Sequence, residues 1–114
     1  MGQAVLGMPS RSGGAAVRTR AKVDGNHGEI MDALHNAGIA AKSLAPMGKG
    51  YPDAIASLRS YTCLLEFKVP GGSLTEAQVK FLESWPGDIW VVENGPQAVE
   101  KVIEGARKVF VGEA

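Results

Sequence analysis

Two strand-like segments that are separated by only two residues constrain the fold of this chain more than any other feature. Residues 53–58 and 61–68 are rich in aliphatic, β-branched and aromatic side chains, and only Arg59 and Ser60 lie between them. A link this short implies an antiparallel hairpin, because two residues suffice for a hairpin turn. The fold should therefore contain a β-sheet that is built around this hairpin.

Periodic patterns predict further elements on both sides of the hairpin. Ile30, Ala33, Leu34 and Ala37 repeat at helical spacing, which predicts a helix over residues 26–37 that ends at Gly38. The remaining expected elements are strands at 39–44 and 89–92, a helix at 75–84 and a last helix from 94–96 onward. The predicted order is α-β-β-β-α-β-α, an α/β fold in which helices flank one mixed sheet.

Capping patterns support two of these helices. Asn26 followed by Glu29, and Thr75 followed by Gln78, each match a capping box at a helix start. Helical spacing also sets Gln78 on the face of its helix that carries Trp85. We therefore expect the Gln78 side chain to face inward.

Length and charge bound the class of protein. A chain of 114 residues has room for one domain, and its single cysteine excludes an internal disulfide framework. We expect a flexible basic arm over residues 1–22 and a folded domain over 23–114. Residues 1–23 hold four basic groups and no acid, so the other eight basic and all twelve acidic groups give the rest a net charge of −4. No segment is apolar enough to span a membrane, and no secretory signal is present, so a cytoplasmic protein is expected.

Polar residues interrupt the hairpin strands at positions that indicate a site. Glu66 interrupts an apolar run and, by strand alternation, projects to the same face as Lys68. Asp53 begins the neighbouring strand, so the hairpin should bring it close to Glu66. Two carboxylates repel each other unless a proton or a cation lies between them, and Mg²⁺ prefers carboxylate and carbonyl oxygens. The alternative is a cross-strand ion pair on a solvated face.

The motif Gly48-Lys49-Gly50-Tyr51-Pro52-Asp53, followed by twelve residues and then Glu66-Phe67-Lys68, resembles the signature of the PD-(D/E)xK nucleases. Within that superfamily the chain is most similar to the small stand-alone VRR-NUC type of bacteriophages. The similarity covers residues 24–103 and includes the helix with Glu29 and the Leu-Thr-Glu-Ala-Gln helix start, but no Val-Arg-Arg stretch. It implies a restriction-endonuclease-like core.

The resemblance also implies a metal site. The carboxylates of Asp53 and Glu66 and the backbone carbonyl of Phe67 would hold Mg²⁺ or Mn²⁺. Glu29 matches the helix acid that binds metal-bound water or a second ion. Lys68 would orient or help to deprotonate the attacking water. Gln78 matches the polar residue that lines the site.

The implied activity is hydrolysis of phosphodiester bonds by a DNA endonuclease, leaving 5′-phosphate and 3′-hydroxyl ends. Branched DNA such as a four-way (Holliday) junction is the expected substrate, a homodimer the expected assembly, and a bacterial or phage-infected cell the expected location. Six residues are candidate DNA contacts: Gly48, Lys49, Gly50, Arg18, Arg20 and Lys22. The alternative function is a non-catalytic nucleic-acid-binding or assembly module with the same fold.

Overall fold

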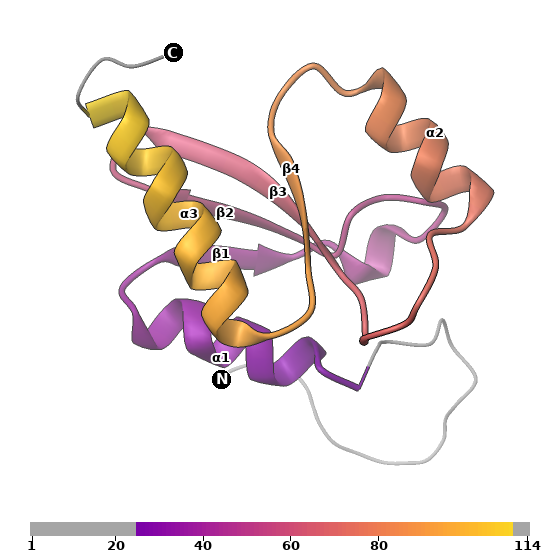
Figure 1. Cartoon of the computed structure of the whole chain (residues 1–114), viewed down its shortest axis with the longest axis horizontal. Helices are drawn as coiled ribbons and strands as arrows, with labels where there is room; N and C mark the ends of the chain where they lie inside the picture. Colours follow the sequence, from indigo (N-terminus) through magenta and orange to yellow (C-terminus); the bar gives the residue numbers. More distant parts are fainter. Residues whose placement is uncertain (1–24, 111–114) are drawn as a thin grey trace.

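Four strands form one mixed sheet at the centre of the protein (Figure 1). The computed structural model describes residues 25–110. The strands are β1 (Ala40–Ser43), β2 (Ala54–Leu58), β3 (Tyr61–Phe67) and β4 (Ile89–Val92), and they lie side by side in chain order. β1, β2 and β3 pair antiparallel, whereas β4 runs parallel to β3. The predicted hairpin between β2 and β3 is confirmed.

Along the chain, one helix precedes the strands, one lies between β3 and β4, and one follows β4. They are α1 (His27–Asn36), α2 (Glu76–Ser84) and α3 (Gly95–Phe110), and a short 3₁₀ helix, η1 (Ala45–Met47), lies between β1 and β2. The order of helices and strands is the α-β-β-β-α-β-α order that the sequence predicts. A parallel pair needs a long crossover, and the segment between β3 and β4, which contains α2, provides it.

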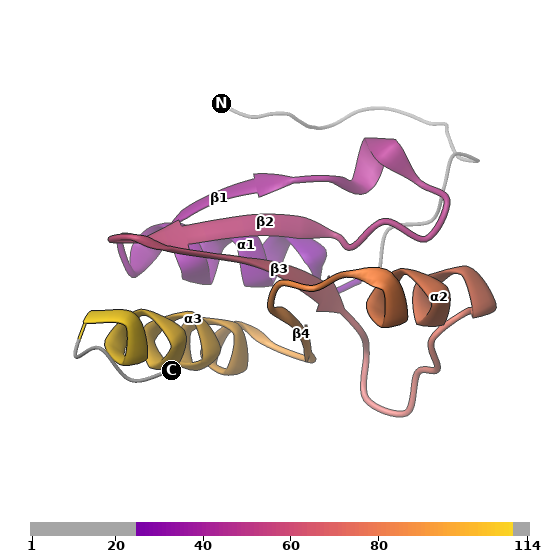
Figure 2. The same cartoon turned by 90° about the horizontal axis from the view of Figure 1, so that it is seen from above.

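The hydrophobic core lies between the sheet and two of the helices. α1 and α3 pack against each other and against the same sheet (Figure 2). The buried core residues are Ile30, Leu34, Ile39, Ala41, Ala54, Ala56, Tyr61, Cys63, Leu65, Phe67, Val92, Ala98, Val102 and Ala106. On α3, Ala98, Val102 and Gly105 recur at the spacing of one helix face. Gly105 lies so close to Tyr61 that a Cβ at this position would overlap the tyrosine ring.

The side chains of β3 alternate between the two faces of the sheet. Cys63, Leu65 and Phe67 belong to the core with α1 and α3. Leu64 and Glu66 therefore project to the opposite face. The charged candidate residue of β3 is thus separated from the main core by the sheet itself.

Contacts with the glycine-rich loop before β2 fix the position of α2, which has no buried residue of its own. Gly50 has a φ of +83°, and a Cβ on it would lie 2.8 Å from the Cβ of Ala77. The Tyr51 ring contacts Phe81 at a centroid distance of 5.3 Å, and Phe81 stacks with Trp85 at 5.4 Å. The loop and α2 therefore pack as one layer beside the sheet.

One local expectation is wrong. Asn26 precedes α1, but its side chain makes no capping hydrogen bond, so the predicted capping box with Glu29 is absent. Next to it, His27 packs against Phe67 with ring centroids 5.0 Å apart. Trp85 after α2 is 45% exposed.

Three further expectations concern the N-terminal arm, membrane-spanning helices and the end of α1. The predicted basic arm, with Arg18, Arg20 and Lys22, lies outside the described residues. None of the helices within residues 25–110 is long and apolar enough to cross a membrane. Gly38, with a φ of +80°, follows the end of α1 as predicted.

Candidate metal and phosphodiester site

Glu66 is the only buried charged residue within the described part of the chain, with 4% of its surface exposed. Gln78 Nε2 donates a hydrogen bond to its Oε2 at 3.0 Å, and Lys68 Nζ lies 3.8 Å from the same oxygen. A buried carboxylate is costly unless hydrogen bonds and an opposite charge compensate it. These two side chains contribute both, so the environment of Glu66 is built by β3 and α2 together.

Asp53 lies immediately before β2 and beside the end of β3. Ala54 pairs with Leu65, and the Asp53 N–H donates to the Leu65 carbonyl at 2.9 Å. Asp53 Oδ2 accepts a hydrogen bond from the Phe67 N–H at 2.7 Å, which holds the carboxylate against β3.

The oxygen atoms at the place where β2 begins and β3 ends suit a hard divalent cation. The Phe67 carbonyl projects to the side of its own N–H, which faces Asp53. Two carboxylates and one carbonyl are ligands that Mg²⁺ or Mn²⁺ prefers. Within residues 25–110 no three His, Cys, Asp or Glu side chains gather as a metal-binding group. A bound ion would therefore need the Phe67 carbonyl and water in addition to Asp53 and Glu66.

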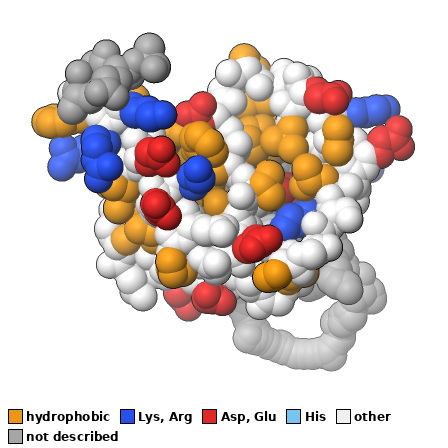
Figure 3. Space-filling model, viewed as in Figure 1, with side chains coloured by type: hydrophobic (Ala, Val, Ile, Leu, Met, Phe, Trp, Pro, Cys, Tyr) orange, Lys and Arg blue, Asp and Glu red, His pale blue; other side chains and the backbone are white. Residues whose placement is uncertain are grey.

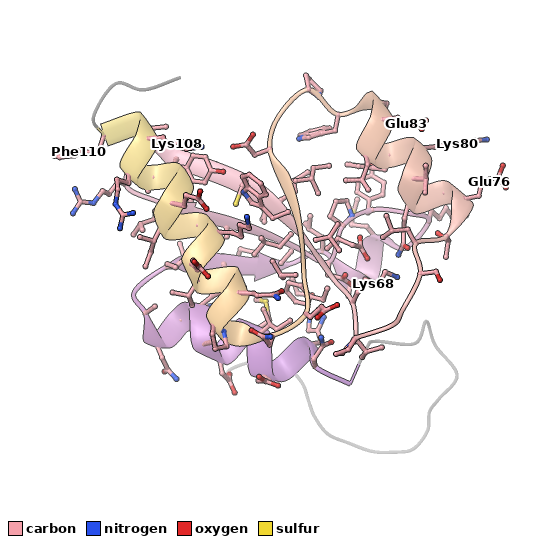
Figure 4. All side chains as sticks on the ribbon, in the orientation of Figure 1. Lys68, Glu76, Lys80, Glu83, Lys108 and Phe110 are labelled. Carbon is pink, nitrogen blue, oxygen red and sulfur yellow. The ribbon has the colours of Figure 1, made fainter. Side chains whose placement is uncertain are left out.

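Lys68 is held at its backbone although β3 ends one residue earlier. Its N–H donates to the Val92 carbonyl at 2.9 Å, and its carbonyl accepts a hydrogen bond from Asn26 Nδ2 at 3.1 Å. Figure 4 shows Lys68 between the end of β3 and α2, whereas Glu76 and Lys80 extend outward from α2. The Lys68 side chain is 15% exposed, so its ammonium group is a largely enclosed positive charge beside Glu66.

The Gln78 amide serves both a helix start and the site. Its Oε1 accepts from the Thr75 N–H at 2.8 Å, and Thr75 Oγ1 accepts from the Gln78 N–H at 3.1 Å. The predicted capping box of α2 is thereby confirmed. The other end of the same amide donates to Glu66. The start of α2 therefore fixes the orientation of a hydrogen-bond donor toward the buried carboxylate.

Glu29 is exposed in the first turn of α1. It does not join Asp53 and Glu66 in a metal-binding group within the described residues. A role for Glu29 toward bound water or a second ion stays a prediction.

The glycine-rich loop turns sharply before the site. Gly48, Lys49 and Gly50 have φ angles of +60°, +54° and +83°. Lys49 is exposed in this turn, although a residue with a Cβ adopts such a φ only at a cost in free energy. The turn therefore presents a cation two residues after η1 and close to the start of α2. Its contact with DNA stays a prediction.

α2 and β4 border the site on one side, and the surface of this border is apolar. Figure 3 shows hydrophobic side chains gathered over α2 and between α2 and β4. Val79 and Trp85 on the α2 side are 37% and 45% exposed, and Val91 is 45% exposed. Val91 pairs with Glu66 in the β3–β4 register, so it lies directly beside the site. The approach from this direction is thus lined by apolar surface.

Groups with shifted pKa values lie elsewhere on β3. Burial raises the pKa of the Cys63 thiol to about 11. Burial and a hydrogen bond to Asp88 raise the pKa of Tyr61 well above its usual range. The Tyr61 hydroxyl donates to Asp88 Oδ2 at 2.6 Å and accepts from Trp90 Nε1 at 2.9 Å. Cys63 and Tyr61 point into the core, so they stabilise the fold and stay protonated at neutral pH.

Sequence reasoning missed one residue of the site. Asn26 resembles a helix cap, yet its amide bonds backbone atoms 42 and 67 positions away. No local pattern reports partners that distant, and only the assembled sheet brings them together.

No protein-family profile matches this chain, and comparisons with curated proteins and with solved structures also give no match.

Proposed function

We propose that the chain is a divalent-metal-dependent DNA endonuclease that hydrolyses phosphodiester bonds. The observation that supports this most directly is the buried Glu66, which lies beside Lys68 on the strand that binds the Asp53 carboxylate. A buried carboxylate is costly for the fold, and replacing buried charges with apolar side chains often leaves a protein equally or more stable. Carboxylates and a lysine at one sheet edge suit a reaction in which negative charge develops on phosphate oxygens.

Each residue has a role that follows from its position. Asp53 and Glu66 would bind the ion with their carboxylates, together with the Phe67 carbonyl. When bound, Mg²⁺ or Mn²⁺ would supply an activated water and polarise the phosphoryl group. Lys68 Nζ would lie near the developing negative charge and orient the attacking water. Gln78 would hold Glu66 in its orientation toward the ion.

The proposed substrate is branched DNA, with four-way junctions as the leading example, and the products would carry 5′-phosphate and 3′-hydroxyl ends. A homodimer would bring two sites to one junction and allow symmetric cuts. The substrate is proposed from the resemblance of the Gly48–Asp53 and Glu66–Lys68 motifs to the small VRR-NUC nucleases. The homodimer is proposed because a chain of 114 residues offers little surface to bind a duplex.

A non-catalytic nucleic-acid-binding module is the second candidate, and one observation favours it. Both carboxylates already have partners, since Asp53 accepts from the Phe67 N–H and Glu66 from Gln78. Under this alternative the acids only stabilise the sheet edge. Removing their charge would then change stability but leave every metal response unchanged.

The two functions are separated by variants that remove one charge of the site at a time. We would incubate the protein with a labelled four-way junction, a matched duplex and a single strand, in Mg²⁺, Mn²⁺ or EDTA. Asp53→Asn retains an oxygen that can accept from the Phe67 N–H, so it removes the charge and keeps the hydrogen bond. Lys68→Ala removes the ammonium group. Glu100→Gln, an exposed acid of α3, is the control.

Metal-dependent cleavage by the wild type and by Glu100→Gln, lost in Asp53→Asn and Lys68→Ala, supports the endonuclease. Cleavage of all three DNAs would retain the nuclease and reject the preference for junctions. Binding of DNA without cleavage in either metal would reject the nuclease and support the non-catalytic module.

A further inference from the structure

The Asn26 side chain joins the ends of two neighbouring strands. Its Nδ2 donates to the Lys68 carbonyl at 3.1 Å and to the Glu93 carbonyl at 2.8 Å. Lys68 follows the last residue of β3, and Glu93 follows the last residue of β4. An amide nitrogen carries two hydrogens, so Asn26 uses both as donors at this place.

The oxygen of the same amide shows which end of the side chain matters. Asn26 Oδ1 is buried and accepts no hydrogen bond within the described residues. It does not cap α1 either, although Asn26 stands at the position where an asparagine oxygen usually does so. A buried acceptor without a donor destabilises the folded state, because it loses its hydrogen bonds to water and gains none. The side chain is therefore oriented for its two donor bonds, at the expense of its oxygen.

One of those bonds completes the attachment of Lys68. Its N–H is bound to Val92, and its carbonyl is bound to Asn26, so its backbone is fixed on both sides beyond the end of β3. A lysine side chain has four rotatable bonds, and the place of its Nζ depends on where its backbone is anchored. The anchored Nζ lies 3.8 Å from Glu66 Oε2.

We infer that Asn26 is a positioning residue of this site: its amide holds the backbone of Lys68 so that Nζ stays beside Glu66. The inference rests on the proposed nuclease function for its catalytic consequence, but the positioning itself is a property of the fold. Asn26 touches no reacting atom and acts through Lys68. A tether that served only stability would hold α1 to the sheet without changing the surroundings of the Lys68 ammonium group.

Two variants and one matched control separate these roles. Asn26→Asp has the same size but no donor, and it turns oxygens toward the two carbonyls. Asn26→Ser is the second variant, for the case that Asn26→Asp does not fold. Tyr61→Phe is the control, because it removes a buried hydroxyl that bonds Asp88 and Trp90 at the opposite end of β3.

The first readout needs neither metal nor DNA. Reductive ¹³C-methylation gives each lysine an NMR resonance. The resonance that is missing in Lys68→Arg is the one from Lys68. We expect this resonance to shift in the folded Asn26 variants and to stay in place in Tyr61→Phe, even where the loss in Tm is equal. An unmoved Lys68 resonance in a folded Asn26 variant would overturn the inference.

The second readout is single-turnover cleavage of the junction DNA. The Asn26 variants should lower the rate about tenfold to a hundredfold, which is the usual effect of a misplacement of about 1 Å, with the Kd for DNA unchanged. Tyr61→Phe should change neither the cleavage rate nor the Kd for DNA. A fall in rate that Tyr61→Phe matches at equal Tm would assign Asn26 to stability alone. If the wild type cleaves nothing, the nuclease proposal fails, and the resonance still decides whether Asn26 positions Lys68.

Discussion

Gln78 Nε2 donates to Glu66 Oε2 at 3.0 Å, while Oε1 of the same amide accepts from the backbone at the start of α2. The helix start and the buried carboxylate therefore depend on one side chain. The two functions of this amide can be separated, because only its nitrogen faces Glu66.

Gln78→Glu keeps the oxygen that completes the capping box but replaces the donor by a second carboxylate beside Glu66. We expect the free energy of unfolding at pH 8 to fall by about 1–3 kcal/mol, measured by urea titration. The like charge raises the folded-state pKa of the carboxylate pair, so the loss should shrink as the pH falls through that pKa. Thr75→Ala is the control: it should cost about 1 kcal/mol through the cap alone, independently of this pH change. Equal stability of Gln78→Glu and wild type would contradict the contact.

Gly50→Ala tests the attachment of the glycine-rich loop to α2. Gly50 and Gly71 have nearly equal φ angles, +83° and +84°, but only Gly50 faces a neighbour, Ala77, at 2.8 Å. Both alanine variants should lose about 1–2 kcal/mol from the left-handed backbone. Gly50→Ala should lose more and should also change the fluorescence of Trp85, because α2 must move. Identical losses, with unchanged fluorescence, would show that the loop does not fix α2.

Replacing two helical glycines by alanine should change the stability of the protein in opposite directions. Gly105 in α3 faces the Tyr61 ring, whereas Gly28 in α1 has open space around it. Gly28→Ala should stabilise the protein by up to about 1 kcal/mol through the unfolded chain, and Gly105→Ala should destabilise it by about 1–3 kcal/mol through overpacking. Thermal unfolding of both variants checks the signs. A stabilised Gly105→Ala would contradict the packing of α3 on β3.

The Cys63 thiol should make the protein less stable in alkali. Its pKa is raised from 9.0 to about 11 by burial, so the folded state retains the proton between these pH values while the unfolded state loses it. Stability should therefore decrease as the pH rises from 9 to 11, by roughly 3 kcal/mol for this one group.

Cys63→Ala removes the titrating group, so its urea unfolding midpoint should depend less on pH over the same range. The difference in stability between wild type and Cys63→Ala should be largest below pH 9. A difference that is constant from pH 8 to 11 would show that the thiol is not buried in the folded state.

Those features of the fold that depend on neighbouring residues could be predicted from the sequence. The two residues between β2 and β3 determine an antiparallel pair, which the register from Leu58–Tyr61 to Ala54–Leu65 confirms. The capping box at Thr75 is also local, since both of its partners lie within one helical turn.

Features that depend on distant packing could not be predicted. Asn26 has the residue type and position of a helix cap, but its amide binds the carbonyls of Lys68 and Glu93 instead. The exposure of Trp85 likewise depends on how far α2 stands from the sheet, which no repeat within 75–84 determines. The catalytic, metal and DNA-contact roles of the site residues stay predictions, because they concern molecules that the chain itself does not contain.

The order of pairing in the sheet has a consequence for how the site assembles during folding. β1, β2 and β3 are consecutive antiparallel neighbours, so the strands that bring Asp53 and Glu66 together close over short stretches of chain. Val92 and Asn26 reach Lys68 only after longer loops have closed, and such contacts form more slowly. We therefore expect the backbone of Lys68 to be fixed later in folding than the hairpin of β2 and β3.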